Sequence, residues 1–283
     1  MKRKLVQKIT EDIDPATVYA TTYQMRNFYA QFKDGFFSNL DVMNYIQHHK
    51  AVKMMKKGDR VLDVCCGRGL LLPLIRYYAK DIKEYVGVDI FPANINAQKR
   101  ISGVKPIDNS NEYYPFKHTM LISSCEDMDK QLEGNSFDLI VYTSAIEHMQ
   151  KEVGVNSLKN CFNLIKKGTG ILFLSCPNTM DKKDPYDCQY DAHLYEWSLE
   201  ELTIELKKLG FRIDNQFGLV VKKRKLMNFI QENPESEAAF LYKAFKDYLP
   251  NEWLSPLVSI NNPELADEVL LICSRPKKGR LLR

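Results

Sequence analysis

Short apolar runs alternate with helical patterns along most of the chain. Each run is of strand length, rich in β-branched or aromatic residues and almost continuously apolar, which is typical of strands covered on both faces. Strands that alternate with helices at this interval predict βαβ units and a doubly wound, mostly parallel α/β sheet. The predicted strands are 60–64, 85–90, 119–123, 137–142, 171–175, 211–221 and 268–274, and the predicted helices between them are 70–79, 91–100, 154–165 and 199–209.

Two further segments accompany this alternating pattern. Residues 1 to about 58 are polar with aromatic side chains interleaved between 19 and 37, and the apolar spacing from 40 to 55 predicts a helix that ends near Gly58. Aromatic residues at roughly helical spacing separate the last two predicted strands. We therefore divide the chain into an N-terminal helical segment (1–57), a core (58–221 and 267–275), a helical insertion (222–266) and a basic tail (276–283).

Composition narrows the class of protein. A chain of 283 residues with 45% apolar content can bury a sizeable core. No run reaches the ~18–20 apolar residues of a membrane span, and no apolar signal region follows Met1, so we expect a cytoplasmic protein without a membrane partner. The formal net charge of +4 is too small to indicate nucleic-acid binding by itself. Seven scattered cysteines without paired C-x-x-C motifs predict reduced thiols and no metal site.

A glycine-containing turn follows the first predicted strand and opens a helix. Asp63 lies near the end of the strand, and Gly67 and Gly69 lie in the turn, where a Cβ would crowd a ligand or prevent the backbone conformation. A dinucleotide-binding turn would need the spacing G-x-G-x-x-G, which is missing. An acid before the turn favours a ligand with a positive end, such as a sulfonium, over one with phosphates. The alternative is an ordinary turn acid with glycines that end a strand.

The turn resembles the first motif of the class I S-adenosylmethionine-dependent methyltransferases, an acid and a variable residue followed by G-x-G-x-G. Asp63, Gly67 and Gly69 match this motif, whereas Cys65 takes the place of the first glycine. The resemblance implies S-adenosylmethionine as the cofactor, with Asp63 near its amino acid end. It also implies a Rossmann-like fold: a seven-stranded, doubly wound, mostly parallel sheet with an antiparallel last strand, plus N-terminal helices and a helical insertion before that strand.

Further matches to this family follow along the chain. An acid, Asp89, ends the second predicted strand 26 residues after Asp63, where it can accept both ribose hydroxyls. The phrase Asn-Ser-Phe-Asp-Leu-Ile-Val at 135–141 closely matches the opening of the family's fourth strand. Relatives hold adenine in the turn around 123–128, and the methyl-donor end lies after the fourth strand. The resemblance thus implies this cofactor-binding set: Asp63, Cys65, Gly67, Gly69, Asp89, Ile90, Cys125, Glu126 and Thr143.

Two histidines are the candidate catalytic residues. His148 ends a Glu-His pair that resembles the family's segment after the fourth strand, at the rim of the cofactor site. His193 lies in the polar segment 181–197, a region that often walls the acceptor pocket in relatives. Either imidazole could act as a base toward a hydroxyl acceptor. The alternatives are a satisfied wall residue for His148 and an ordinary loop histidine for His193.

The resemblance implies transfer of a methyl group from S-adenosylmethionine to O, N or C of a small-molecule acceptor. Relatives build acceptor pockets from the places that segments 1–57 and 222–266 occupy, so we expect a lid and an acceptor-binding element there. One rival is an RNA or other nucleic-acid methyltransferase of cap or ribose type, which the Lys-Lys-Arg-Lys sequence at 222–225 favours. Another is a catalytically silent cofactor-binding scaffold, which Cys65 favours. Oligomeric state is not indicated by the sequence.

Overall fold

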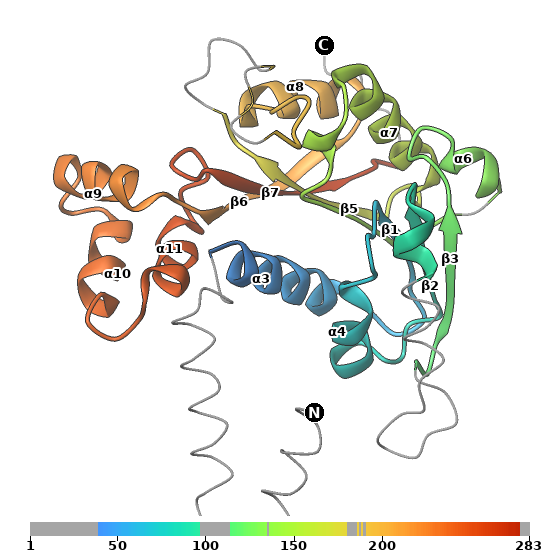
Figure 1. Ribbon diagram of the computed structural model, residues 1–283, viewed down its shortest axis with the longest axis horizontal. Coiled ribbons are helices and arrows are strands. Elements are labelled where there is room, and N and C mark those ends of the chain that lie inside the picture. The colour runs from blue at the N-terminus through green and yellow to red at the C-terminus, as the bar shows by residue number, and fades with distance from the viewer. Residues whose placement is uncertain are drawn as a thin grey trace, which may run out of the picture.

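A seven-stranded sheet forms the centre of the protein (Figure 1). The computed structural model describes residues 39–96, 114–134, 136–179, 186, 188 and 191–277. The predicted lid aromatics between 19 and 37, the end of the predicted helix 91–100 and residues 278–283 lie outside these ranges. The strands are β1 (Arg60–Val64), β2 (Glu84–Asp89), β3 (Lys117–Ile122), β4 (Leu139–Thr143), β5 (Ile171–Pro177), β6 (Arg212–Val220) and β7 (Glu268–Ser274).

The strand order is β3-β2-β1-β4-β5-β7-β6. All pairs from β3 to β5 are parallel, and β7 runs antiparallel to both of its neighbours. The predicted doubly wound, mostly parallel sheet with an antiparallel last strand is therefore confirmed. The chain order reverses between β1 and β4, and such a switch point is where α/β sheets bind ligands, outside the carboxyl ends of the strands.

Helices cover both faces of the sheet (Figure 1). On one face, α3 and α4 bury Val52, Leu72 and Ile75 against residues of the central strands. On the other face, α6, α7 and α8 bury Met128 and other apolar side chains against the same strands. Burial on both faces explains why the central strands are almost continuously apolar. The helices are α3 (Asn39–Met54), α4 (Leu71–Tyr78), α6 (Met128–Gln131), the 3₁₀ helix η1 (Ile146–His148), α7 (Lys151–Leu164) and α8 (Leu199–Lys208).

The predicted insertion between the last two strands is helical. It consists of α9 (Lys223–Glu232), α10 (Glu237–Phe245) and α11 (Asn251–Ser259), which share a small apolar core of their own. This group of helices lies beyond the β6 edge of the sheet (Figure 1), and α11 packs against both α3 and β6. Phe240 and Tyr248 are 70% and 83% exposed, so these two aromatic residues do not belong to that core.

One predicted boundary differs clearly from the observed one. The helix predicted at 154–165 begins at Lys151, and Gly154 is an interior position of α7. A Cβ at Gly154 would lie 3.2 Å from Ile146 and 3.3 Å from Trp197, so the glycine permits close packing at this point. The other strand and helix ends that the structure describes agree within about two residues, the usual scatter of such assignments. Among the described residues, none of the helices has the length and apolar character required to cross a bilayer.

Candidate functional site

The turn after β1 has an unusual backbone conformation. Cys65, Gly67 and Gly69 have φ angles of 55°, 54° and 72°. Glycine adopts this left-handed region freely, whereas a residue with a Cβ pays a conformational cost. Cys65 therefore occupies a position whose backbone favours the glycine of the motif that the turn resembles. The turn is held to the next strand by the Cys66 N–H, which donates to the Val88 carbonyl at 3.0 Å.

Asp89 links this turn to the end of β2. Its Oδ2 accepts from the Gly67 N–H at 2.8 Å, and its Oδ1 accepts from the Phe91 N–H at 2.9 Å and the Asn94 amide at 3.2 Å. The side chain is buried, with 6% exposure. The structure thus brings the predicted cofactor residues 67 and 89 into direct contact. Ile90, the next predicted residue, is 58% exposed at the same edge of the sheet.

Asp63 is a buried acid beneath the turn. Its carboxylate accepts a hydrogen bond of 2.7 Å from the Tyr85 hydroxyl. The pKa of Asp63 is raised to about 7, mainly by burial; the Tyr85 hydrogen bond lowers this pKa and the nearby Asp89 charge makes a smaller contribution that raises it. Gly87 on β2 leaves room for the Cys66 side chain, because a Cβ at position 87 would lie only 2.9 Å from the Cys66 sulfur. Cys66 therefore packs behind the turn, as a small core residue.

The predicted adenine turn is fixed by a residue of α7. The Asn160 side-chain amide donates to the carbonyl oxygens of Cys125 at 3.1 Å and Glu126 at 2.7 Å. The Glu126 N–H donates to the Ser124 hydroxyl at 3.2 Å, and the Glu126 carboxylate accepts from Asn156 at 3.2 Å. Glu126 also lines a polar hollow of about 450 Å³ between α6 and α7.

The thiols of Cys65 and Cys125 meet beneath the two turns. A hydrogen bond with Cys125, together with burial, raises the pKa of the Cys65 thiol well above its usual range. The Cys125 sulfur also lies 3.8 Å from the sulfur of Met149. Two predicted cofactor residues from separate turns are thus in contact through their side chains.

The carboxyl end of β4 meets α3. His48 Nε2 lies 3.3 Å from the Thr143 hydroxyl, and burial lowers the pKa of His48 to about 4, so its imidazole is neutral at pH 7. The Gln47 amide donates to the Ser144 hydroxyl at 3.2 Å and accepts from the Ser175 hydroxyl at 2.5 Å. Helix α3 therefore places neutral polar groups at the predicted methyl-donor end.

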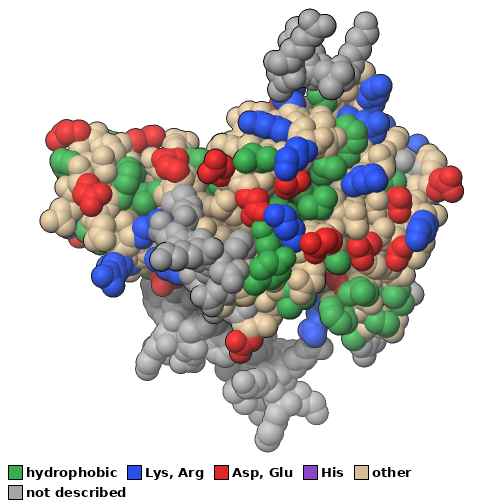
Figure 2. Space-filling model, turned by 90° about the horizontal axis from the view of Figure 1, so that it is seen from above, with side chains coloured by type: hydrophobic (Ala, Val, Ile, Leu, Met, Phe, Trp, Pro, Cys, Tyr) green, Lys and Arg blue, Asp and Glu red, His purple; other side chains and the backbone are tan. Residues whose placement is uncertain are grey.

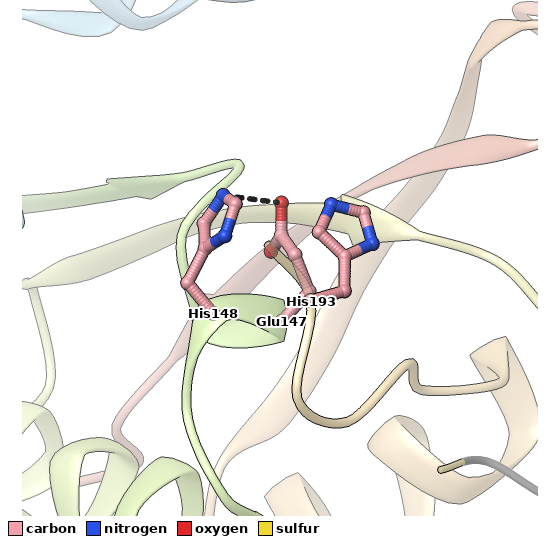
Figure 3. A group of neighbouring side chains, drawn as sticks. All are labelled: Glu147, His148 and His193. Carbon is pink, nitrogen blue, oxygen red and sulfur yellow. Dashed lines mark ion pairs between the residues drawn. The ribbon is translucent and has the colours of Figure 1, made fainter. Parts of the chain in front are cut away.

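The two candidate catalytic histidines lie next to each other (Figure 3), with ring centroids 5.0 Å apart. Between them lies the carboxylate of Glu147, whose Oε1 is 4.0 Å from His148 Nε2. His148 Nδ1 is 2.9 Å from the Ala192 carbonyl oxygen, and His193 Nδ1 is 2.5 Å from Glu196 Oε1. Residues that are 45 positions apart in the sequence thus form one cluster beyond β4.

Buried carboxylates surround this cluster. Glu147 and Glu196 are each 2% exposed and Glu268 is 6% exposed. Burial raises the pKa of Glu147 to about 8, with a smaller contribution from the Glu196 charge. Burial and the charge of Glu147 also raise the pKa of Glu268 well above its usual range, although Glu268 accepts a hydrogen bond of 3.1 Å from Ser144. The acids come from η1, β7 and the segment before α8, so the fold concentrates them here.

Some residues of this region were not foreseen from the sequence. One signal was available for Glu268, which is an acid at the start of an apolar strand. Because β7 is antiparallel, its first residue lies opposite Pro177, at the carboxyl end of β5. Gln47, His48 and Asn160 carry no local signal, since their partners are distant in the sequence. Glu196 differs from them, because its partner His193 is only three residues away.

Charges of both signs are distributed over the surface that Figure 2 shows. Lys and Arg side chains alternate there with Asp and Glu, and the described side chains on this face form no continuous basic patch. In the basic sequence at 222–225, Lys225 Nζ lies 3.7 Å from the Asp267 carboxylate, which offsets part of its charge.

The fold is shared with solved structures of methyltransferases. An S-adenosylmethionine-dependent methyltransferase from Archaeoglobus fulgidus is 20% identical, with coverage of 88% of this chain and 100% of that chain and a TM-score of 0.54. A putative methyltransferase from Haloferax volcanii, in complex with the Trm112 activator, is 15% identical (87% and 96% covered, TM-score 0.53). The small RNA methyltransferase HEN1 is 18% identical (82% and 25% covered, TM-score 0.55).

Sequence comparison gives the family. No curated protein matches the chain. The family described as "Methyltransferase domain" matches residues 43–216, which include β1 to β5, both turns and the histidine cluster. This match covers more than half of the chain and agrees with the sheet order. The chain therefore belongs to the methyltransferase domain family and has the Rossmann-like fold of the class I S-adenosylmethionine-dependent methyltransferases.

Proposed function

We propose that the protein transfers the methyl group of S-adenosylmethionine to O, N or C of a small-molecule acceptor. The observation that carries the proposal is the hydrogen bond between Gly67 and Asp89, which joins the two predicted cofactor turns beside the switch point of the sheet. The position of α3 supports an acceptor site on the same edge, because His48 reaches the end of β4 and α11 of the insertion packs against α3.

The turn residues fit this cofactor. A Cβ built at Gly67 would meet no atom within 4 Å, so the backbone there faces open space that a ligand can approach. Asp89 Oδ2 accepts one hydrogen bond from the Gly67 N–H, and a carboxylate oxygen has two lone pairs, so it can also accept a ribose hydroxyl. We assign ribose binding to Asp89 and the amino acid end to the turn above Asp63.

Methyl transfer from a sulfonium mainly requires the protein to align the donor and the acceptor. The sulfonium supplies an activated methyl group: the S–CH₃ bond breaks as the acceptor atom forms a bond to carbon, and a neutral thioether leaves. The chain has to hold donor and acceptor in line and exclude water. Thr143 and the neutral His48 would border the donor end, and His148 or His193 would accept the proton of a hydroxyl acceptor.

Calorimetry of Asp89 variants tests the cofactor assignment. We expect Asp89→Ala to weaken S-adenosylmethionine binding at least about 100-fold, because hydrogen bonds to a charged group contribute about 1.5–3 kcal/mol each. Asp89→Asn keeps one side-chain oxygen that can accept from the Gly67 N–H, so the turn is retained. Comparison of the two variants therefore shows whether affinity is lost through the ligand contact or through disruption of the turn. Asp81→Ala, an exposed acid before β2, is the matched control and should bind normally. Unchanged affinity in both Asp89 variants would contradict the assignment.

A nucleic-acid acceptor is the second candidate, and the basic start of α9 favours it. RNA binding that weakens steeply with salt, together with methylation of RNA, would select this alternative over a small-molecule acceptor. The absence of a melting-temperature shift with both S-adenosylmethionine and its demethylated product would favour a catalytically silent scaffold over a methyltransferase.

A further inference from the structure

Three side chains beyond β4 form a compact group of metal-binding type. Glu147, His148 and His193 each offer one ligand atom, and these atoms all lie within 4.8 Å of one another. Figure 3 shows the carboxylate between the two imidazole rings. Two histidines and one carboxylate are a donor set that proteins use for divalent transition metals such as Zn²⁺.

Glu147 carries a buried oxygen that the protein leaves unsatisfied. Its side chain is only 3% exposed, and Oε2 has no hydrogen-bond partner among the described residues. A buried polar atom without a partner costs about 1–3 kcal/mol, and more when it is charged. The carboxyl groups of Glu196 and Glu268 are buried nearby. A bound cation would satisfy the Glu147 oxygen that has no hydrogen-bond partner among the described residues.

Both histidines are oriented as metal-binding histidines commonly are. His148 Nδ1 faces the Ala192 carbonyl at 2.9 Å, and His193 Nδ1 faces the Glu196 carboxylate at 2.5 Å. A neutral imidazole that donates from Nδ1 carries its lone pair on Nε2. Hydrogen bonds of this kind to a carbonyl or a carboxylate fix the ring and its tautomer in metal sites.

Among the three side chains of the group, solvent reaches mainly His148. The side chain of His148 is 46% exposed, whereas those of His193 and Glu147 are 9% and 3% exposed. Three protein ligands with one accessible side leave a coordination position for water or a substrate atom, which is the arrangement of catalytic metal sites and not of closed structural ones.

We propose that Glu147, His148 and His193 bind a divalent transition-metal ion of the Zn²⁺ class, with Glu196 orienting His193 as a positioning residue. The sequence predicted no metal site, because the three ligands follow no contiguous metal-binding motif. The ion would lie on the η1 side of the proposed acceptor region, where Glu147 follows Ser144 by three residues. In the metal-bound protein the Nε2 atoms of His148 and His193 hold the ion, so these imidazoles act as bases only in the metal-free protein. Binding of the metal can be measured without a methyl donor, so its failure is distinguishable from failure of the proposed function.

The test is calorimetric titration of chelator-treated full-length protein with Zn²⁺, supported by the visible spectrum of the Co²⁺ form, which reports ligand geometry. We expect one ion per chain. His148→Ala and Glu147→Gln should each weaken binding at least about 100-fold, and Glu196→Gln about 10–100-fold, the usual effect of a partner that orients a ligand. His118→Ala, on the edge strand β3, is the matched control and should bind as the unchanged protein does.

Glu147→Gln is nearly isosteric, so it keeps the test valid if the alanine variant does not fold, and circular dichroism checks folding in each case. Two results would overturn the proposal: no stoichiometric uptake of Zn²⁺ by the unchanged protein, or uptake that the Glu147→Gln and His148→Ala variants leave unaltered. The second result would place the ion on other groups of the chain.

Discussion

The left-handed backbone at Cys65 predicts an inverted preference between alanine and glycine. Cys65→Ala and Cys65→Gly differ only by one Cβ, at a residue whose φ is 55°. The left-handed conformation costs a residue with a Cβ about 1–2 kcal/mol. Glycine loses about 0.5–1 kcal/mol more conformational free energy on folding than alanine does. The difference of the central values leaves the glycine variant more stable by about 0.75 kcal/mol, within a range of about 0–1.5 kcal/mol.

The neighbouring residue supplies the control. Cys66 is not among the described non-glycine residues with positive φ, and its side chain is buried behind the turn. There the ordinary order should hold, with Cys66→Ala more stable than Cys66→Gly by about 0.5–1 kcal/mol. The sign of the effect should therefore reverse between two adjacent positions.

Urea unfolding at equilibrium measures both pairs. With a slope of about 3 kcal/mol per molar urea, a difference of this size moves the midpoint by about 0.2–0.3 M. If alanine at 65 proves as stable as glycine or more stable, the left-handed conformation is not what limits this position. The reasoning about the motif would then be refuted, whatever the variants do to cofactor binding.

Three other predictions concern stability. Burial raises the pKa of Asp63 to about 7 in the folded protein, so the folded state binds more protons than the unfolded state and stability falls as pH rises from about 4 to 7. Asp63→Asn should remove this fall. Compared with the unchanged protein, the variant should therefore be more stable at pH 8 than at pH 5 in urea unfolding. The pKa of His48 is lowered to about 4, so the unfolded state binds more protons and stability is lost as pH falls from about 6.5 to 4; His48→Gln should weaken that acid loss, and an unchanged profile would show that another group causes it. The Ser198 hydroxyl accepts from the Glu201 N–H at the start of α8, so Ser198→Ala should cost about 1 kcal/mol by thermal unfolding, whereas Ser198→Thr should lose much less.

Much of the structure around the proposed cofactor turns could be predicted because its information is local. The spacing of Asp63, Gly67 and Gly69 specifies a turn within seven residues, and Asp89 follows after one helix and one strand. The apolar runs predicted the strands because burial on both faces leaves few polar positions. The capping serine of α8 was foreseen for the same reason, since Ser198 and Glu201 are three residues apart.

The groups around the end of β4 could not be predicted in the same way. His48 and Thr143 are 95 residues apart, and Gln47 lies on the buried face of a helix that the apolar pattern alone would fill with aliphatic residues. His148 and His193 were each identified from their own segments, but their contact depends on how the segment before α8 folds back over η1. Such pairings are set by tertiary structure, which periodicity does not encode.

The position of β7 between β5 and β6 has a consequence for synthesis of the chain. β6 ends at Val220, yet within the described sheet it pairs only with β7, which begins at Glu268. During translation β6 leaves the ribosome well before its partner, and helices α9–α11 emerge in between. We expect those helices to collapse on their own small core while the edges of β5 and β6 remain unpaired. During this interval the nascent chain is most prone to pair with the wrong strand.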